Sequence, residues 1–418
     1  MRANSIVRNI VLIWIGWALV ILAFQHWIGA RLDLSGPDKV LFWTAAETTA
    51  GSQDDKPYLN DQFLNEQVAW DSEFYLSIAT LGYDDLAVRG IPSDFAWGFR
   101  QQFCRPGAEV ECTSLSYAFF PLYPWLTRIV TFPLRVLPLT SIAHSTLAAV
   151  IVSLLGALGA MLALYFMARD SLGEEGGLRA AFYLLIFPSG FFMAQVYPEG
   201  LFLGLTFGAL AFLLARKWGW SALLAALAVW TRPGGALLLL PMAMVWVKDK
   251  AWQGNWKSVI RSGLAALSPA LSFGVWSLTP FAKNFYLVEA LFFGRGLLAV
   301  KQSLDAWKGA LMLFSSGNMQ SRVYYSLEFA AILLALVTCI LLFKQQPEIS
   351  LFGLAMIVFA FTSGAAQGML RYVLTSPALF WMLAKWGKQP AFDRVWSIAC
   401  ILVMGMGAIL FSFNFWVA

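Results

Sequence analysis

Two carboxylates, Asp71 and Glu73, lie beside Trp70 in the polar segment that runs from Ala69 to Tyr83. A carboxylate placed next to a substrate hydroxyl can act as a general base. Helical spacing puts Asp71 on the same face as the aromatic and apolar side chains that follow it, which predicts a short amphipathic helix. The alternative is a solvated acid on a surface helix, and this segment alone is compatible with both.

Three further charges interrupt apolar stretches of the chain. Glu199 lies in the segment 195–200, Arg232 lies in 230–234, and Arg371 follows the segment 364–369. Charges at membrane depth are costly and usually face a polar cavity, although a snorkelling or paired structural charge is the alternative for each. Arginine binds phosphate through two parallel hydrogen bonds. Acids and arginines together suit transfer from a lipid phosphate, with a carboxylate that activates the acceptor hydroxyl.

Aromatic residues accompany these charges. We expect them to stack on sugars or to flank a polyprenyl tail, and the same residue types also form ordinary interfacial belts. In this hypothesis Glu73 and Glu199 position sugar hydroxyls or balance charge. The aromatic candidates for substrate binding are Trp70, Tyr83, Tyr123 and Tyr372.

The composition is that of a membrane protein. Of the 418 residues 59% are hydrophobic and 13% are charged, whereas about a quarter of an average soluble chain is charged. Many apolar runs approach the ~20 residues that a bilayer-crossing helix needs. The net charge of +5 comes mostly from short loops, as the positive-inside rule explains, so no nucleic-acid partner is expected. No Walker-type phosphate loop is present, which disfavours an ATP-driven or nucleotide-sugar mechanism.

The charge pattern also predicts a topology. Arg2 and Arg8 place the N-terminus in the cytoplasm, and the first apolar run is expected to stay as an anchor. The residues 30–117 then form a long extracytoplasmic loop with fourteen acidic and six basic side chains, carrying short interfacial helices. We expect residues 1–418 to form one integral membrane domain with this loop inserted between its first two spans.

The sequence therefore predicts an all-α polytopic membrane protein with about eleven transmembrane helices and an extracytoplasmic C-terminus. Residues 119–139 are expected to be interfacial or partly re-entrant, and 282–321 to form an outer loop. The predicted spans are 9–28, 142–168, 180–193, 198–215, 219–231, 233–247, 262–281, 322–343, 349–366, 372–384 and 395–416.

The four cysteines fall into two pairs. Cys104 and Cys112 share the long loop and form a disulfide if that loop faces an oxidising compartment, with two free thiols as the alternative. Cys339 and Cys400 lie in apolar spans and are interpreted as packing residues. No His/Cys metal spacing is present. No cofactor is expected to be required, because arginines can neutralise a lipid monophosphate, although the acidic loop leaves a divalent cation possible.

Two motifs resemble the PIG-V family of GPI mannosyltransferase II type. They are Trp70-Asp71-x-x-x-Tyr75-Leu76-x-Ile78-Ala79-x-x-Gly82-Tyr83 and the segment from Ala118 to Pro124. Tyr197-Pro198-Glu199 and Arg371-Tyr372 resemble later family positions. Two departures are present: Ala69 stands where a basic residue often precedes the Trp-Asp pair, and the segment from Thr231 to Gly235 lacks the family's Ser-Asn-Gly character.

The resemblance implies a GT-C glycosyltransferase fold and an inverting transfer of a sugar, mannose in this family, from a polyprenyl-phosphate donor on the extracytoplasmic side. The functional acid of the family maps onto Asp71. Arg371, with Arg232, is expected to hold the donor phosphate. Compact cytoplasmic loops suggest a prokaryotic relative in a bacterial cell membrane, with a lipid or glycan acceptor. Surrounding membrane lipids are the other expected partners.

Two other functions remain compatible with the same residues. A transporter or flippase of lipid-linked or polar substrates would use these charges along a pathway, although their concentration at one side favours an enzyme. An oligosaccharide ligase or polymerase would take a lipid-diphosphate donor. The sequence leaves the sugar, the acceptor, the length of the lipid chain and the oligomeric state open.

Overall fold

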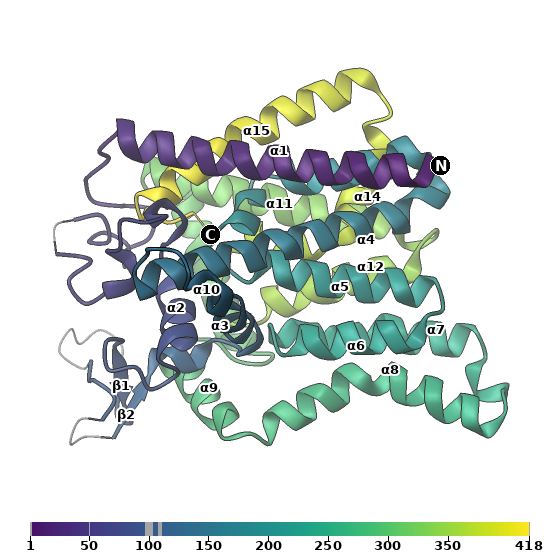
Figure 1. The fold of residues 1–418 in the computed structure, drawn as a ribbon, viewed down its shortest axis with the longest axis horizontal. Helices are drawn as coiled ribbons and strands as arrows, with labels where there is room; N and C mark the ends of the chain where they lie inside the picture. The colour runs from purple at the N-terminus through teal and green to yellow at the C-terminus, as the bar shows by residue number, and fades with distance from the viewer. Residues whose placement is uncertain (1, 50, 97–102, 108–110, 418) are drawn as a thin grey trace.

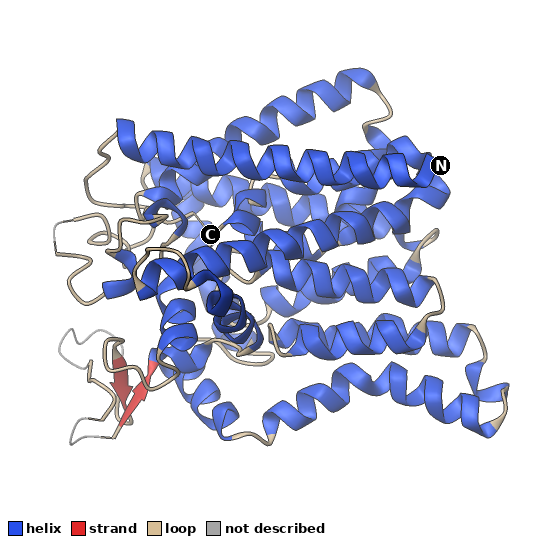
Figure 2. Cartoon of the chain, viewed as in Figure 1, coloured by secondary structure: helices blue, strands red, loops and turns tan. Residues whose placement is uncertain are grey.

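The computed structural model describes residues 2–49, 51–96, 103–107 and 111–417, and it is a helical bundle. Figure 2 shows helices almost throughout, with two short strands at one end. These are β1 (Gly90–Pro92) and β2 (Cys112–Ser114), which pair antiparallel with Gly90 opposite Ser114. The predicted all-α class is confirmed.

Among the described residues, five helices are long and apolar enough to cross a bilayer. They are α1 (Arg2–Arg31), α4 (Ser141–Ile186), α8 (Trp256–Ser277), α11 (Met319–Phe343) and α15 (Pro390–Ser412). Four shorter apolar segments lie between them: α5 (Glu199–Leu214), α6 (Trp218–Val229), η5 with α7 (Pro233–Leu238 and Leu239–Lys248), and α12 (Pro347–Phe361). The chain is therefore an integral membrane protein, while the predicted number of eleven crossings is not confirmed.

Several elements differ from the predicted boundaries. The span expected at 142–168 and the first part of the span expected at 180–193 lie in the single element α4, which ends at Ile186 and is interrupted at Gly173 by non-helical dihedrals (φ 74°, ψ 174°). The loop expected at 282–321 instead contains α9 (Pro280–Leu291) and α10 (Val300–Ser316). Hydropathy misses α10 because its charged and apolar residues alternate at helical spacing, so that no long apolar run marks the helix.

The remaining elements are short. Residues 119–139 contain α3 (Leu122–Leu134), and the segment with the two carboxylates forms α2 (Ser72–Thr80). The last third of the chain adds α13 (Met369–Tyr372) and α14 (Pro377–Trp386). Short 3-10 helices connect them: η1 (Pro57–Leu59), η2 (Asn65–Gln67), η3 (Leu115–Ala118), η4 (Gly190–Ala194), η6 (Ala251–Gln253) and η7 (Val373–Thr375).

The long helices run side by side across Figure 1, with the N-terminus at one end of the bundle. The segment that follows α1, together with β1 and β2, lies at the opposite end, here called the loop end. The C-terminal residues pack there too, because the backbone N–H of Trp416 donates a 2.6 Å hydrogen bond to the carboxylate of Asp38. The first loop and the last residues of the chain therefore meet at one end of the bundle.

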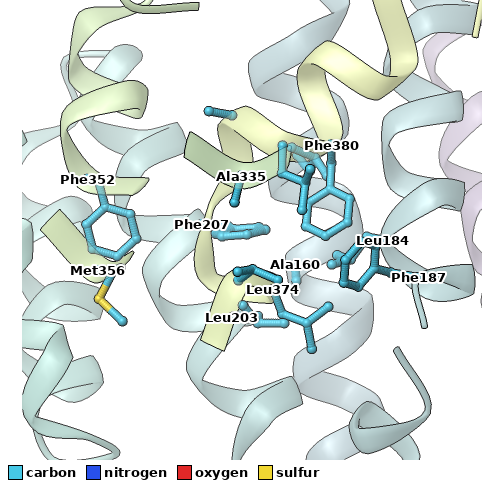
Figure 3. Packing of buried hydrophobic residues seen from close by; sticks show 14 of the residues in the cluster. Ala160, Leu184, Phe187, Leu203, Phe207, Ala335, Phe352, Met356, Leu374 and Phe380 are labelled. Atoms are coloured by element: carbon cyan, nitrogen blue, oxygen red, sulfur yellow. The ribbon is translucent and has the colours of Figure 1, made fainter. Parts of the chain in front are cut away.

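The centre of the bundle is formed by α4. In its most apolar stretch 61% of the residues are buried, against 17% for α1 and α8, whose side chains therefore face outward toward lipid. Figure 3 shows the core between α4, α5 and the later helices, where Ala160, Leu203, Phe207, Leu374 and Phe380 pack together.

Glycines allow α4 and α5 to approach closely. A Cβ at Gly156 would overlap the backbone of Gly200, and one at Gly200 would overlap the carbonyl oxygen of Ser153. Small residues at such crossings are the usual means by which membrane helices pack backbone to backbone. Because Gly200 is the second residue of α5, this crossing fixes the first turn of that helix and the side chain of Glu199.

The hairpin near the loop end carries a disulfide bond between Cys104 and Cys112. The backbone groups of Gly90 and Cys104 also exchange two hydrogen bonds, of 2.8 and 3.0 Å. Cys339 and Cys400 are free and buried, and Cys339 contacts Ser376 at 3.2 Å. The disulfide bond ties residues 103–107 to β2.

Candidate active site

A cavity of about 590 Å³ opens at the loop end. Its wall combines charged residues with many aromatic and aliphatic side chains. Its lining includes six of the residues singled out from the sequence: Trp70, Asp71, Glu73, Arg232, Arg371 and Tyr372. The structure thus brings segments from the first loop, from the turn after α6 and from α13 to one enclosed space.

Asp71 occupies the position before the first turn of α2. Its neighbour Trp70 has a left-handed backbone conformation (φ 53°), which is uncommon for a residue with a large side chain. The indole of Trp70 packs edge-to-face against Trp43 and Trp416, at ring distances of 5.9 and 5.0 Å. The backbone N–H of Asp71 donates to the hydroxyl of Tyr197 at 3.2 Å. These contacts hold the carboxylate of Asp71 toward the cavity.

Arg371 joins two acids. Its Nη1 lies 3.3 Å from Oδ2 of Asp71, and its Nε lies 3.4 Å from Oε1 of Glu199. Glu199 also forms an ion pair with Nη2 of Arg232. The side chains of Arg371 and Glu199 are only 6% and 3% exposed, against 27% for Asp71. The result is an alternating row of two carboxylates and two guanidinium groups, of which Asp71 is the end most accessible to the cavity.

Glu199 is held by the start of α5. It is the first residue of that helix, where the exposed backbone N–H groups and the helix dipole favour a negative charge. Ser153 of α4 donates a 2.5 Å hydrogen bond to the carbonyl of Tyr197, which ties the turn before the helix to the bundle. Glu199 does not line the cavity; it lies behind Arg371 and Arg232.

Arg232 comes from the turn between α6 and η5. Its backbone is extended (φ −158°, ψ 147°), as the following Pro233 favours. Gly235 folds back onto α6 so closely that a Cβ there would lie 2.5 Å from the backbone of Ala228. The turn therefore points the guanidinium inward rather than toward lipid.

Arg371 depends on a buried acid for its position. Glu328 in α11 has no exposed surface, and its carboxylate accepts hydrogen bonds from the backbone N–H groups of Gly368 (3.1 Å) and Leu370 (2.8 Å). Gly368 has φ 77°, a conformation that glycine adopts at little cost. Glu328 therefore fixes the start of α13, the four-residue helix that presents Arg371 and Tyr372.

Sequence reasoning missed Arg295 and Glu289, which also line the cavity. Nη1 of Arg295 donates a 3.1 Å hydrogen bond to the hydroxyl of Tyr372. Burial raises the pKa of Glu289 to about 7, and the nearby Arg295 opposes the shift. Both lie in the stretch interpreted as an outer loop. The sequence signal that could have identified Arg295 is a charged residue between two glycines, Gly294 and Gly296, directly after an aromatic pair.

Glu73 lies on another part of the cavity wall and is 2% exposed. Burial raises its pKa to about 7, and the positive charges of Lys56 and Arg89 oppose the shift. Lys56 itself forms a 2.7 Å ion pair with Glu47. The cavity thus has a second charged region, separate from the row that contains Asp71.

Tyr83 and Tyr123 do not line the cavity. The hydroxyl of Tyr83 donates to the carbonyl of Phe119 at 2.8 Å, and its ring stacks on Tyr117. Tyr123 is fully buried and donates to the carbonyl of Ala149 at 3.0 Å. Both tyrosines contribute to the packing that joins α2 and α3 to α4. They are therefore buried and do not face a substrate.

The groups available for chemistry beside Asp71 are therefore Glu289, the three arginines Arg232, Arg295 and Arg371, and the hydroxyl of Tyr372. Within the described part of the chain, no group of three or more His, Cys, Asp or Glu side chains is arranged to hold a metal ion. What the arrangement can do is accept a proton at Asp71 and stabilise negative charge at the guanidinium groups.

No protein-family model and no curated protein matches the chain. Among solved structures it aligns with ArnT from Cupriavidus metallidurans bound to undecaprenyl phosphate, at a TM-score of 0.47 and 14% identity, over 97% of this chain and 76% of that one. It also aligns with the oligosaccharyltransferase of Archaeoglobus fulgidus tethered to an acceptor peptide, at a TM-score of 0.41 and 12% identity, over 96% of this chain and 55% of that one. The chain thus spans about half the length of the archaeal protein.

Proposed function

We propose that this protein is an inverting glycosyltransferase of the GT-C type, which moves a sugar from a polyprenyl-phosphate donor to a hydroxyl of a lipid or glycan acceptor. The observation that carries the proposal is the position of Asp71. Its carboxylate lies on the wall of a large cavity and contacts Arg371, and two further arginines, Arg232 and Arg295, line the same cavity. A base and a group of cations in one enclosed space are what transfer from a lipid phosphate requires.

In the proposed reaction, an acceptor hydroxyl lies against Asp71 and gives its proton to the carboxylate. The acceptor oxygen forms a bond to the anomeric carbon while the bond from that carbon to the phosphate oxygen breaks. The electron pair leaves on the phosphate, and polyprenyl phosphate is the second product. Arginine side chains stabilise the negative charge of the leaving group, most strongly where water is excluded.

The lining of the cavity supports a lipid-linked substrate. Beside the charged groups, aromatic and aliphatic side chains cover much of the wall. Apolar walls with a few convergent polar groups are typical of small-molecule sites. Aromatic residues such as Phe119 and Phe293 suit an isoprenoid chain, and Trp70 offers a flat surface for a sugar.

Two finer points belong to the proposal. The resemblance of the motifs around Asp71 to the PIG-V type points to mannose as the sugar. The basic N-terminus points to a cytoplasmic start and an extracytoplasmic loop end, in a bacterial cell membrane. The disulfide in the hairpin agrees with an oxidising compartment at the loop end.

The test uses the full chain purified in detergent, with polyprenyl-phosphate mannose and a mixture of lipid and glycan acceptors. Release of polyprenyl phosphate, coupled to a glycosylated product, is expected in the absence of any ion or voltage gradient. A transporter would give no turnover under these conditions. Turnover only with a lipid-diphosphate donor would identify an oligosaccharide ligase or polymerase and contradict the monophosphate donor proposed here.

A further inference from the structure

Arg295 lies in the turn between α9 and α10 and faces the same cavity as Asp71. Its backbone N–H donates a 2.8 Å hydrogen bond to the carbonyl of Glu289 at the end of α9. Its Nη1 donates to the hydroxyl of Tyr372 at 3.1 Å. Arg295 is thus held at both its backbone and its side chain, by two elements far apart in the sequence.

The charge of Arg295 is compensated differently from the charges of its neighbours. Arg371 contacts Asp71 and Glu199, and Arg232 contacts Glu199. Within the described residues, Arg295 forms no such ion pair with a carboxylate. The nearby Glu289 has its pKa raised to about 7 by burial, so a large fraction of it is neutral near neutral pH. The half-buried guanidinium of Arg295 thus has no carboxylate in direct contact among the described residues, and an anionic ligand in the cavity would supply that ion pair.

Tyr372 adds a donor at the same point. Its hydroxyl oxygen accepts the hydrogen bond from Arg295, which leaves the phenolic proton to be donated to a ligand. Burial raises the pKa of Tyr372, but three nearby guanidinium groups outweigh burial and bring the pKa below its ordinary value. A more acidic hydroxyl is a stronger donor to an anion.

Three glycines, Gly294, Gly296 and Gly364, line the cavity near these two side chains. Gly364 (φ 114°) approaches the preceding turn so closely that a Cβ there would overlap the carbonyl oxygen of Gly294. The backbone N–H of Gly296 donates to the carbonyl of Ser363 at 2.9 Å. Two turns therefore pack backbone to backbone and form a stretch of cavity wall without large side chains next to Arg295.

An apolar wall continues from this point. Ala306 of α10 and three residues of α12, namely Met356, Phe359 and Ala360, line the same cavity. The charged group of a ligand at Arg295 could thus carry an attached hydrocarbon chain along α10 and α12. No charged residue of these two helices lines the cavity within the described part of the chain.

We propose that Arg295 and Tyr372 bind the phosphate of the polyprenyl-phosphate donor, with the isoprenoid chain lying along α10 and α12. This assignment rests on the proposed function, and it differs from the expectation that Arg371 and Arg232 hold the phosphate. Those two arginines compensate Asp71 and Glu199 and keep the base in place. Arg295 and Tyr372 hold the leaving group.

The experiment measures equilibrium binding of a polyprenyl monophosphate without sugar, and of the corresponding uncharged polyprenol, to the full chain in detergent. Wild-type protein is expected to prefer the phosphate. Arg295→Gln is expected to reduce that preference by roughly tenfold or more, since a hydrogen bond to a charged group is lost. Arg295→Lys should retain part of it, and Tyr372→Phe should lose a smaller part.

Arg322→Gln is the matched control, because Arg322 is an exposed arginine of α11 that does not line the cavity. It should bind both lipids like the wild type. Unfolding temperatures and unchanged polyprenol binding show that each variant is folded. If the Arg295→Gln variant prefers the phosphate over the polyprenol as strongly as the wild type does, the assignment is overturned.

The two proposals fail in different ways. If sugar transfer occurs while phosphate binding is independent of Arg295, the enzyme activity stands and this site is wrong. If phosphate binding depends on Arg295 but no donor is ever turned over, the phosphate site stands and the proposed transfer is wrong.

Discussion

The guanidinium group of Arg371 lies 3.3 Å from the carboxylate of Asp71, although 300 positions separate them in the sequence. The contact joins the first loop to the short helix α13 near the end of the chain. Glu199 holds the opposite side of the same guanidinium, at 3.4 Å. Arg371 therefore orients Asp71 toward the cavity, and the proposed base depends on groups from three separate parts of the bundle.

The position of Glu199 predicts a large loss of stability when its charge is removed. In Glu199→Gln, Arg232 and Arg371 both lose a buried anionic partner. Breaking a buried ion pair by removing one partner costs about 3 to 5 kcal/mol. We expect the unfolding temperature in detergent to fall clearly and transfer activity to fall with it.

Glu175→Gln provides the comparison for this variant. Glu175 is an exposed carboxylate of α4 near the kink at Gly173, and its replacement should leave both stability and transfer unchanged. Equal unfolding temperatures for Glu199→Gln and Glu175→Gln would show that the buried row of charges does not stabilise the site.

The sequence was sufficient to predict the class of fold and the gathering of four site charges in one place. Hydropathy and the positive-inside pattern give the helical membrane class, and they place the segments around Asp71, Glu199, Arg232 and Arg371 at one side. The structure brings these four residues together. Charged residues in apolar segments indicate where a site lies, because each such charge must be compensated by another polar or charged group nearby.

Other features depend on packing that periodicity does not encode. Tyr83 and Tyr123 are buried because α2 and α3 pack on α4, a tertiary contact with no local signal. Arg295 and Glu289 were missed because α9 and α10 have too little hydropathy to be recognised as structured parts of the bundle. The separate roles of the arginines follow only from knowing which acid each one contacts.

Glu328 is predicted to act on catalysis through the position of α13. Its carboxylate accepts from two backbone N–H groups, of Gly368 and Leu370, and the amide of Glu328→Gln can accept with one oxygen only. An unpaired buried N–H costs about 1 to 3 kcal/mol. We expect a lower turnover number because Arg371 moves, with a smaller rise in KM for the donor because Tyr372 belongs to the same short helix.

Ser326→Ala tests whether the effect is specific to Glu328. Ser326 is exposed on the same helix, and its hydroxyl donates a hydrogen bond to the carbonyl of Arg322 one turn earlier. It should keep wild-type turnover. A change of KM alone in Glu328→Gln would contradict a role in positioning Arg371.

The buried Glu73 is predicted to make stability depend on pH. Its pKa is raised from 4.5 to about 7 by burial, so between these values the folded protein keeps a proton that the unfolded chain releases. The free energy of unfolding must then decrease as pH rises through this window, by an amount on the order of 3 kcal/mol. In Glu73→Gln this part of the decrease should be absent.

The measurement is the unfolding temperature from pH 4.5 to about 8 for wild type and Glu73→Gln. Asp33→Asn, at an exposed carboxylate next to α1, serves as the control and should follow the wild-type curve. Parallel curves for wild type and Glu73→Gln over the whole range would show that Glu73 does not release its proton in this window.

The disulfide gives a test of topology in native membranes. Cys104 and Cys112 are bonded, whereas Cys339 and Cys400 are free and buried. If the loop end is extracytoplasmic, alkylation after denaturation without reductant should label only the two free cysteines. All four should be labelled after reduction. Labelling of Cys104 and Cys112 without reductant would contradict an oxidising environment at the loop end.

The central claim is that Asp71 is the general base of a sugar transfer. The most direct measurement is the single-turnover rate of Asp71→Asn with a polyprenyl-phosphate sugar and acceptor, alongside its binding of polyprenyl phosphate. The amide cannot take the acceptor proton, so the rate should fall by roughly 100- to 10,000-fold, while folding and lipid binding persist. Transfer at the wild-type rate by a folded Asp71→Asn protein would contradict the account.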